Sequence, residues 1–347
     1  MHRGFLNALK ILILKPSSLG DVVQALPVLR LLKLHRPDSE IFWWISADLA
    51  PLLENDPDLS GVIVFQRHRW ATPWHWGELL RSVRDIRAQK FDWVLDLQAL
   101  ARSALISWLA GGRLTVGLED WREGAPGFYD LVIPRPTPLT HAVDWYLDVL
   151  KALKVPVHSN FVWMPPRREA AASVQRRWNP EPGPWIGINP GARWPNKRWP
   201  ASYYAELVRD LAADNPQCRF AIFGGRSDAP LGELIASAAP QCCLDLTGRT
   251  SLPELVEWLR LTDVVVTNDT GPMHIAAALG KRVVSIFGPT EPRRTGPYGQ
   301  LGDALQKPLP CAPCLQPKCT FERPLECLQG ITPARVRLRT NSLLRSE

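Results

Sequence analysis

No apolar run in this chain of 347 residues reaches the roughly 18 residues that a membrane-spanning helix requires. The N-terminal stretch MHRGFLNALKILILKP carries a basic residue and an apolar patch but lacks a small-residue cleavage site. We therefore interpret its ILIL segment as a first strand and not as part of a secretory signal. Hydrophobic residues make up 46% and charged residues 22% of the chain, as in ordinary globular proteins. These features predict a cytoplasmic protein.

Dense blocks of Lys and Arg are also missing, although the formal net charge is +7. A basic excess suits phosphate-rich partners such as nucleotides, nucleic acid or an anionic membrane surface, and a solvated surface explains it equally well. The sequence has no recognisable nucleic-acid-binding module, so nucleic acid is not an expected partner. Tryptophan is unusually common, with 15 residues, and several stand beside Arg, as in RHRW and DWRE. Such pairs are typical of interfaces and stacking, while other tryptophans must belong to the core.

The sequence has seven cysteines, and the spacing of the last four matches no standard zinc motif. Three lie in or beside predicted strands and are expected to pack as small hydrophobes: Cys218, Cys242 and Cys243. The other four share one Pro-rich stretch with the spacing C-x2-C-x4-C-x7-C: Cys311, Cys314, Cys319 and Cys327. In a cytoplasmic protein this clustering favours a structural zinc or iron ion over disulfides, with reduced thiols or a redox-labile pair as the alternative.

Apolar strands alternate with helical patterns along the whole chain, which is too long for one ordinary core. The expected strands are 9–15, 40–46, 61–65, 92–98, 114–118, 185–191, 219–225, 242–248, 263–269 and 282–288. The expected helices are 20–35, 77–88, 101–110, 202–214, 231–239, 251–262 and one that begins at Pro272. This alternation predicts an α/β protein with two doubly wound parallel sheets. The predicted domains are residues 1–170 and 183–335, followed by a tail at 336–347.

Polar segments follow several of these strands, and ligands of open parallel sheets bind at the carboxyl ends of strands. We therefore expect the polar segments of the two domains to line one shared cleft. The first is KPSSLGDVV (15–23), where Ser18 and Gly20 form a turn before a helix. Its backbone N–H groups could bind phosphate, although the segment is neither a P-loop nor G-x-G-x-x-G. Asp21 could equally be a helix cap.

Two further polar segments lie in the second half. NPGARWPNKRWP (189–200) gathers positive charge directly after a strand, and Lys197 could neutralise a phosphate there. A solvated basic loop is the alternative. FGGRSDAP (223–230) places Asp228 after a strand and two glycines, where its carboxylate could accept hydrogen bonds from ribose hydroxyls or cap a helix.

The fourth segment, VVVTNDTGPMHIAAALG (264–280), contains the triplet Asp-Thr-Gly that aspartic proteases also use. A protease of that class needs two such triplets in an all-β setting, whereas this triplet joins a parallel strand to a helix. Asp269 could hold sugar hydroxyls, and the N–H groups of Thr270 and Gly271 could face a pyrophosphate. His274, one turn further on, could reach the same ligand.

Taken together, these motifs resemble glycosyltransferase family 9, the heptosyltransferases, from about residue 10 to about residue 335. ILKPSSLGDVVQALPVLRLL resembles the N-terminal signature of the family. NPGARWPNKRWP, VVTNDTGPMHIAAALGKRVVSIFGPTEP and the late cysteine stretch resemble its C-terminal signatures. The resemblance implies the GT-B fold, with an acceptor-binding N-terminal domain and a nucleotide-sugar-binding C-terminal domain. It also implies inverting transfer from ADP-heptose to the inner core of lipopolysaccharide, with no cofactor needed for catalysis.

Roles carry over residue by residue. Asp21 matches the proposed general base of the family, and Lys197 matches its phosphate-binding lysine. Asp228 falls where the family often has Glu beside the donor nucleoside. The D-[ST]-G-x-x-H donor motif is matched by Asp269, Thr270, Gly271 and His274, and the turn before Asp21 adds Ser18 and Gly20 to the expected donor contacts.

Other segments resemble those of heptosyltransferase I, which adds the first heptose to Kdo. DLQALARSA (96–104), GLEDWREG (117–124) and RHRW (67–70) supply the expected acceptor contacts, Gln98, Arg122, Arg67 and Arg69. The implied partners are ADP-heptose or a related nucleotide sugar, a lipid A–Kdo or inner-core acceptor, and the cytoplasmic face of the inner membrane. The alternatives are a family member with another donor or acceptor, such as heptosyltransferase II or III or a protein heptosyltransferase, and a nucleotide-sugar-binding protein without activity.

Overall fold

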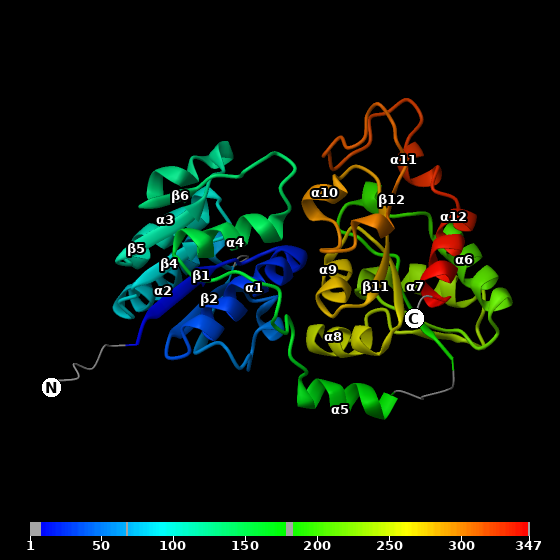
Figure 1. Cartoon of the computed structure of the whole chain (residues 1–347), viewed down its shortest axis with the longest axis horizontal. Helices are drawn as coiled ribbons and strands as arrows, with labels where there is room; N and C mark the ends of the chain where they lie inside the picture. The colour runs from blue at the N-terminus through cyan, green and yellow to red at the C-terminus, as the bar shows by residue number, and fades with distance from the viewer. Residues whose placement is uncertain (1–7, 67–68, 178–182, 346–347) are drawn as a thin grey trace. The chain divides into compact units, whose positions relative to one another are not determined.

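The computed structural model describes residues 8–66, 69–177 and 183–345, and the chain divides into two compact units at the Pro165–Pro166 junction. Each unit contains a six-stranded sheet whose paired strands are all parallel, flanked by helices (Figure 1). The expected α/β class with two doubly wound parallel sheets is therefore confirmed. Within the described ranges, no helix has the length and apolar character needed to cross a bilayer.

The first unit alternates strands and helices through Ala152. Its strands are β1 (Lys10–Leu14), β2 (Glu40–Ser46), β3 (Gly61–Phe65), β4 (Trp93–Asp96), β5 (Leu114–Leu118) and β6 (Leu131–Ile133). Its helices are α1 (Leu19–His35), α2 (Trp76–Ala88), α3 (Ala101–Ala110) and α4 (Ala142–Ala152). Short 3-10 turns include η2 (Arg69–Ala71), η3 (Pro73–His75), η4 (Trp121–Glu123) and η5 (Ala125–Phe128).

The second unit repeats the alternation. Its strands are β7 (Trp185–Asn189), β8 (Arg219–Ile222), β9 (Cys243–Asp245), β10 (Val264–Asn268), β11 (Arg282–Phe287) and β12 (Ala304–Gln306). Its longer helices are α5 (Arg168–Arg177), α6 (Ala201–Asp214), α7 (Ala229–Ala236), α8 (Leu252–Leu261), α9 (Gly271–Ala278) and α12 (Pro333–Arg345), and the one-turn helices are α10 (Pro292–Thr295) and α11 (Glu326–Gln329). The C-terminal helix α12 packs on α6 and buries Val336 and Leu343, so it is part of this unit.

Both sheets have the same strand order. The first is β3-β2-β1-β4-β5-β6, and the second, read from the other side, is β9-β8-β7-β10-β11-β12. In each sheet the chain starts at a central strand, runs outward to one edge and returns to build the other half. The order reverses between β1 and β4 in the first sheet and between β7 and β10 in the second. The carboxyl ends at such a reversal form a crevice in which doubly wound folds bind ligands.

The central strands are buried on both faces, as expected for parallel sheets covered by helices. Ile11, Leu14, Val264 and Val266 are fully inaccessible, and every residue of β7 is buried. Helix α1 is buried at every position from Val22 to Leu32, which explains why its sequence is apolar on all sides.

Crossovers between parallel strands are right-handed, and this handedness decides which helices share a face of the first sheet. The β1–β2 crossover runs toward one edge, while the β3–β4 and β4–β5 crossovers run toward the other. Helix α1 therefore covers one face, where α4 packs against it, and α2 and α3 lie side by side on the opposite face (Figure 1).

Candidate active site

Asp21 lies in the first turn of α1, directly after the carboxyl end of β1. Ser18 is the N-cap of this helix, and both its backbone N–H and its hydroxyl donate to Asp21 Oδ2, at 2.9 and 2.6 Å. An acidic side chain at the third helical position is favoured by these bonds and by the helix dipole. Asp21 therefore completes a capping box, and its carboxylate is held at the point where the strand order reverses.

A buried lysine lies behind this carboxylate. Lys15 follows β1 and is only 4% exposed. Its Nζ donates to the backbone oxygen of Leu97 at 2.8 Å and lies 4.9 Å from the ring centre of Tyr146. Burial alone would lower the pKa of Lys15, but the negative charges of Tyr146, when ionised, and of Asp21 and Asp96 raise it overall. Lys15 is therefore a fixed positive charge near the start of α1.

Asp96 ends β4, the strand beside β1, and is fully buried. Tyr129 Oη donates to its Oδ2 at 2.8 Å, and the backbone N–H groups of Gln98 and Ala99 donate to its Oδ1 at 2.9 and 3.1 Å. Burial raises the pKa of Asp96, although these hydrogen bonds act in the opposite direction. The result is a rigid turn after β4 that carries Gln98, a predicted acceptor contact, at the same reversal point as Asp21.

The second unit brings Lys197 and Asp269 together. Lys197 ends the short turn η6 (Pro195–Lys197) after β7, and Asp269 follows β10. Their Nζ and Oδ2 atoms are 2.6 Å apart, and Thr290 Oγ1 also donates to Asp269 Oδ2 at 2.6 Å. Asp269 is 6% exposed, whereas the Lys197 side chain is 19% exposed. The pair thus has its carboxylate inside and its ammonium nearer the surface, where it can meet an anionic ligand.

Asn268 fixes the strands that carry this pair. Its side chain is fully buried; Oδ1 accepts from Trp199 N at 3.0 Å and Tyr204 Oη at 3.1 Å, and Nδ2 donates to Pro190 O at 2.7 Å. These three bonds tie the end of β10 to the 190–199 loop that contains Lys197. Asn268 is therefore a positioning residue.

The remaining donor-motif residues lie at the start of α9. Thr270 is its N-cap, and Gly271 is its first residue. The N-terminus of α9 thus begins next to Asp269, at the reversal point of the second sheet, where backbone N–H groups favour an anion. His274 lies in the first turn of α9 and is 8% exposed.

Asp228 lies in the turn after β8, against two glycines. Its Oδ2 accepts from Gly225 N at 3.0 Å, and Arg198 approaches its Oδ1 to 3.7 Å. A Cβ added at Gly191 would lie 2.5 Å from Asp228 Oδ2. Glycine at position 191 therefore lets the loop after β7 pass directly over this carboxylate. The polar segments 189–200 and 223–230, both predicted to bind the nucleotide sugar, meet at this point.

The predicted acceptor arginines are paired with local acids. Arg69 donates to Glu78 Oε1 at 2.7 Å, and Arg122 makes a forked contact with Asp120, with its Nε 2.9 Å from both carboxylate oxygens. Arg67 lies outside the described residues. Both hydrogen-bonding groups of Ser18, its N–H and its hydroxyl, are directed to Asp21. Binding of the nucleotide sugar by Ser18 and Gly20 therefore stays a prediction.

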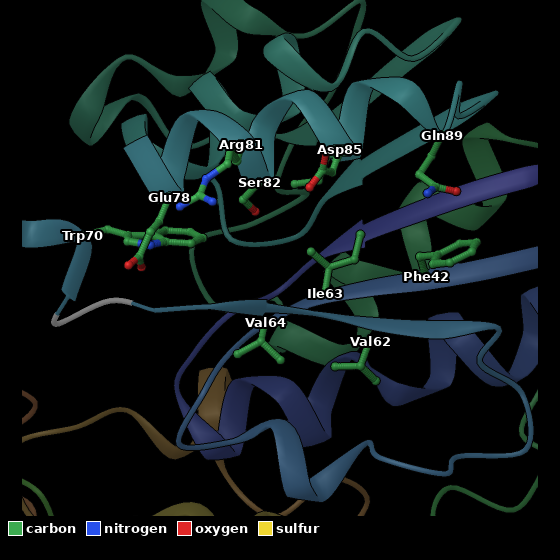
Figure 2. Close-up of a pocket in the computed structure, with 11 residues that line it drawn as sticks. Phe42, Val62, Ile63, Val64, Trp70, Glu78, Arg81, Ser82, Asp85 and Gln89 are labelled. Atoms are coloured by element: carbon green, nitrogen blue, oxygen red, sulfur yellow. The ribbon is translucent and has the colours of Figure 1, made fainter. Parts of the chain in front are cut away.

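A hollow of about 550 Å³ lies elsewhere in the first unit, between the edge strand β3 and α2. Figure 2 shows Val62, Ile63 and Val64 of β3 across from Arg81 and Asp85 of α2. Glu78, which pairs with Arg69, and Trp70, which follows Arg69 in the chain, both line this hollow. It is a groove along a sheet edge and not the crevice at the strand reversal.

The seven cysteines are all free. Cys218 and Cys242 are buried as predicted. The four late cysteines are partly exposed, and burial, followed by the nearby Cys319 and Cys311, raises the pKa of Cys327. Among the residues that the structure describes, no group of three or more His, Cys, Asp or Glu side chains could hold a metal ion. The structure gives no support to the predicted zinc or iron site.

Several of these residues were not singled out from the sequence: Lys15, Asp96, Asn268 and Thr290. Lys15 and Asn268 stand inside segments already recognised as polar strand ends, so their position was a usable signal. Thr290 follows β11, the neighbour of β10, and only the sheet order shows that it meets Asp269. Asp96 can be recognised as a neighbour of the Asp21 region only from the pairing of β4 with β1.

The chain is similar to known proteins along most of its length. Residues 79–324 match the family model described as "Glycosyltransferase family 9 (heptosyltransferase)". The chain is 29% identical to lipopolysaccharide heptosyltransferase 1 of Pseudomonas aeruginosa, covering 97% of this chain and 98% of that protein. It is 30% identical to lipooligosaccharide heptosyltransferase 2 of Haemophilus influenzae, covering 83% and 86%. The structure of Escherichia coli ADP-heptose lps heptosyltransferase II superimposes with a TM-score of 0.76 at 26% identity, covering 97% and 98%.

Proposed function

The chain belongs to glycosyltransferase family 9, the heptosyltransferases, and we propose that it transfers heptose from ADP-heptose to the Kdo or inner-core region of a lipopolysaccharide acceptor. The solved relative and the curated relatives have activities of this kind in their names. The two-unit fold matches that relative over nearly its whole length, in agreement with the implied GT-B class.

The observation that carries this proposal is where the polar residues lie. Asp21 and Gln98 follow β1 and β4, and Lys197 and Asp269 follow β7 and β10. These are the strand pairs at which the order reverses in each sheet. One unit presents a carboxylate and the other a lysine beside a helix N-terminus, so a proton acceptor and an anion site are available in separate units.

In the proposed reaction, the Asp21 carboxylate takes the proton of the acceptor hydroxyl. The acceptor oxygen forms a bond to the anomeric carbon of heptose, while the bond from that carbon to the β-phosphate oxygen of ADP breaks on the opposite face. The electron pair leaves with ADP, so the anomeric configuration inverts. Lys197 and the N–H groups at the start of α9 stabilise the charge that grows on the diphosphate.

Asp269 has a different proposed role from that of Lys197. Its Oδ2 already accepts from Lys197 and Thr290, so it orients the lysine as well as offering its carboxylate to sugar hydroxyls. Asp228, beside the β8 turn, is the proposed ribose contact, and His274 is proposed to approach the same ligand from α9. Arg69, Arg122 and Gln98 remain the proposed acceptor contacts, together with Arg67.

A donor and acceptor screen read by mass spectrometry tests the proposal. ADP-heptose and ADP-glucose are each offered with lipid A–Kdo and with an acceptor that already carries one heptose. A heptose-sized mass gain from ADP-heptose supports the proposal, and the acceptor that gains it separates first from later addition. Binding of ADP-heptose without product on either acceptor would favour a binding protein that lacks this activity.

A further inference from the structure

Four tryptophan side chains are exposed on neighbouring elements of the first unit. Trp74 of η3 is 93% exposed, Trp76 of α2 is 56%, Trp108 of α3 is 59% and Trp121 of η4 is 66% exposed. Elsewhere the tryptophans include fully buried core residues such as Trp43, Trp44, Trp199 and Trp258. The core therefore has tryptophans of its own, and the exposed four are not explained by packing.

These side chains belong to one layer. Helix α2 packs against α3, α3 packs against η5, and η4 packs against η5. All lie on the face of the sheet opposite α1, and their outward side chains add Leu80, Leu105 and Phe128, which are 69%, 43% and 36% exposed. We call the seven exposed side chains the tryptophan face: Trp74, Trp76, Leu80, Leu105, Trp108, Trp121 and Phe128.

The helix periodicity shows that this exposure is systematic. On α2 the inward positions are Leu79, Val83 and Ile86, while Trp76 and Leu80 share the outward side. On α3 the residues Arg102, Leu105 and Trp108 recur every three positions and are all exposed. Each helix thus has an inward apolar side and, on its outward side, two apolar side chains that are between 43% and 69% exposed.

Positive charge lies beside the part of the tryptophan face that α2 and α3 form, whereas Trp121 of η4 lies among mixed charges, with Glu119 and Glu123 exposed beside Arg122. The fully described helices α2 and α3 expose four arginines, Arg81, Arg84, Arg87 and Arg102, against one exposed carboxylate, Asp85. Arginine stems lie along apolar surface while their guanidinium groups reach outward, and basic side chains are attracted to anionic lipid headgroups. Tryptophan is enriched where water meets lipid, because its ring is amphipathic.

We propose that the tryptophan face docks on an anionic lipid surface. The side chains project into solvent from α2, α3 and the neighbouring 3-10 turns, which suits insertion between headgroups. The proposal rests on the proposed function in one respect, since a lipid-linked acceptor gives the enzyme reason to approach a bilayer. Arg122 directly follows Trp121, and Arg69 precedes Trp74 by one short turn, so the face borders the proposed acceptor contacts.

Vesicle sedimentation tests this directly and needs no catalysis. The full chain is mixed with vesicles of phosphatidylethanolamine with or without phosphatidylglycerol. We expect binding to the anionic vesicles that weakens as salt is raised. The triple variant Trp74→Ala/Trp76→Ala/Leu80→Ser should bind about tenfold more weakly, because peripheral binding scales with buried apolar area. A second variant on another helix, Leu105→Ser/Trp108→Ser, should show the same loss.

The matched control is Leu338→Ser/Leu234→Ser, which removes side chains that are 72% and 47% exposed in the second unit. It should bind vesicles like the wild type. Wild-type protein that stays in the supernatant, or face variants that bind as well as the control, would overturn the proposal. A concentration-dependent dimer that both face variants abolish, without vesicle binding, would assign the face to self-association instead.

Activity assays keep this proposal separate from the proposed function. If transfer occurs, the face variants should retain their rate on a deacylated, water-soluble acceptor and lose it only on acceptor embedded in vesicles. Transfer lost equally on both acceptors would also contradict a lipid-docking role. If no transfer occurs with any protein, sedimentation alone still decides whether the face binds lipid.

Discussion

Asp21 has an observed capping role and a proposed catalytic role, and the two can be separated at the level of its side chain. Its carboxylate accepts two bonds from Ser18 and is also the proposed base. In Asp21→Asn the amide oxygen can still accept from the Ser18 N–H, but it cannot take a proton from the acceptor. We expect kcat to fall by about 10²–10⁴, with ADP affinity and thermal midpoint close to those of the wild type.

The second capping box provides the matched control. Glu254 accepts from Ser251 N at 2.8 Å and Ser251 Oγ at 2.9 Å at the start of α8. Glu254→Gln removes a charge from the same kind of cap, and we expect normal turnover. If Asp21→Asn also turned over within a few-fold of wild type, Asp21 would be a cap only.

Lys15 should act on the reaction through its charge. Its raised pKa keeps it protonated across the working pH range. A nearby positive charge favours the ionised form of a carboxylate, so Lys15→Met should move the acidic limb of the kcat–pH profile to higher pH. Lys15→Arg should restore the limb at least in part. A profile that is lower but unshifted in Lys15→Met would indicate a structural role alone.

Lys197 and Asp269 should behave as one unit. Each single alanine variant leaves the other charge without its 2.6 Å partner, so both should weaken ADP binding, and the double variant should be less impaired than the sum. Isothermal titration of the four proteins measures this coupling, which we expect at about 0.5–3 kcal/mol. Additive losses would show that the two side chains contact the donor independently. ADP-heptose titrations then show whether Asp269 adds a contact to the sugar.

At the level of elements, Asn268 joins β10 to the loop after β7. Asn268→Leu would leave Trp199 N, Tyr204 Oη and Pro190 O without this partner inside the second unit. Unpaired buried polar groups cost about 1–3 kcal/mol each, so we expect a thermal midpoint several degrees lower and weaker ADP binding. Asn341→Ala, which removes an exposed bond to Asp214, is the control and should change neither. An unaltered midpoint in Asn268→Leu would contradict the positioning role.

The sequence predicted elements best where burial is one-sided or complete. Helix α3 at 101–110 and strand β5 at 114–118 have the predicted bounds, and α8 lies within the predicted helix 251–262, with Ser251 as its N-cap. Strands β6 and β12 were not predicted, because three residues are too few for alternation to register; β9 is equally short, but it lies inside the longer predicted segment 242–248. Helix α4 was also not predicted, although its Val143, Tyr146 and Leu150 recur at helical spacing and could have revealed it.

Candidate site residues could be predicted from the sequence where a local motif marks them, and could not be where their contacts depend on strand order. Asp21, Lys197 and Asp269 could be named because each stands at a strand end in a recognisable segment. The Thr290 contact with Asp269 and the Lys15 bond to Leu97 could not be, because both depend on which strands are neighbours in the sheet. Strand order is a long-range property, and local sequence periodicity carries no information about it.

At the scale of the whole molecule, the two sheets share one strand order but present different chemistry at their reversal points. The first has a capped carboxylate backed by a buried lysine, and the second has an ion pair beside a helix N-terminus. A divided protein of this kind is expected to bind its two substrates with different units. ADP should therefore act on the second unit even when no acceptor is present.

Hydrogen exchange of the full chain, with and without ADP, tests this division. A ligand that binds only the folded state stabilises it by about 2.7 kcal/mol at a hundredfold excess over Kd, and local protection should concentrate where the ligand makes contact. We expect slower exchange in 189–200, 224–229 and 268–275, and little change in α2 and α3. Lys197→Ala at the same ADP concentration should lose most of this protection. Additional protection at 17–22 would support the predicted donor contacts of Ser18 and Gly20, because that segment belongs to the first unit. Protection confined to the first unit would reverse the assignment, with the nucleotide bound beside Asp21 and the acceptor beside Lys197.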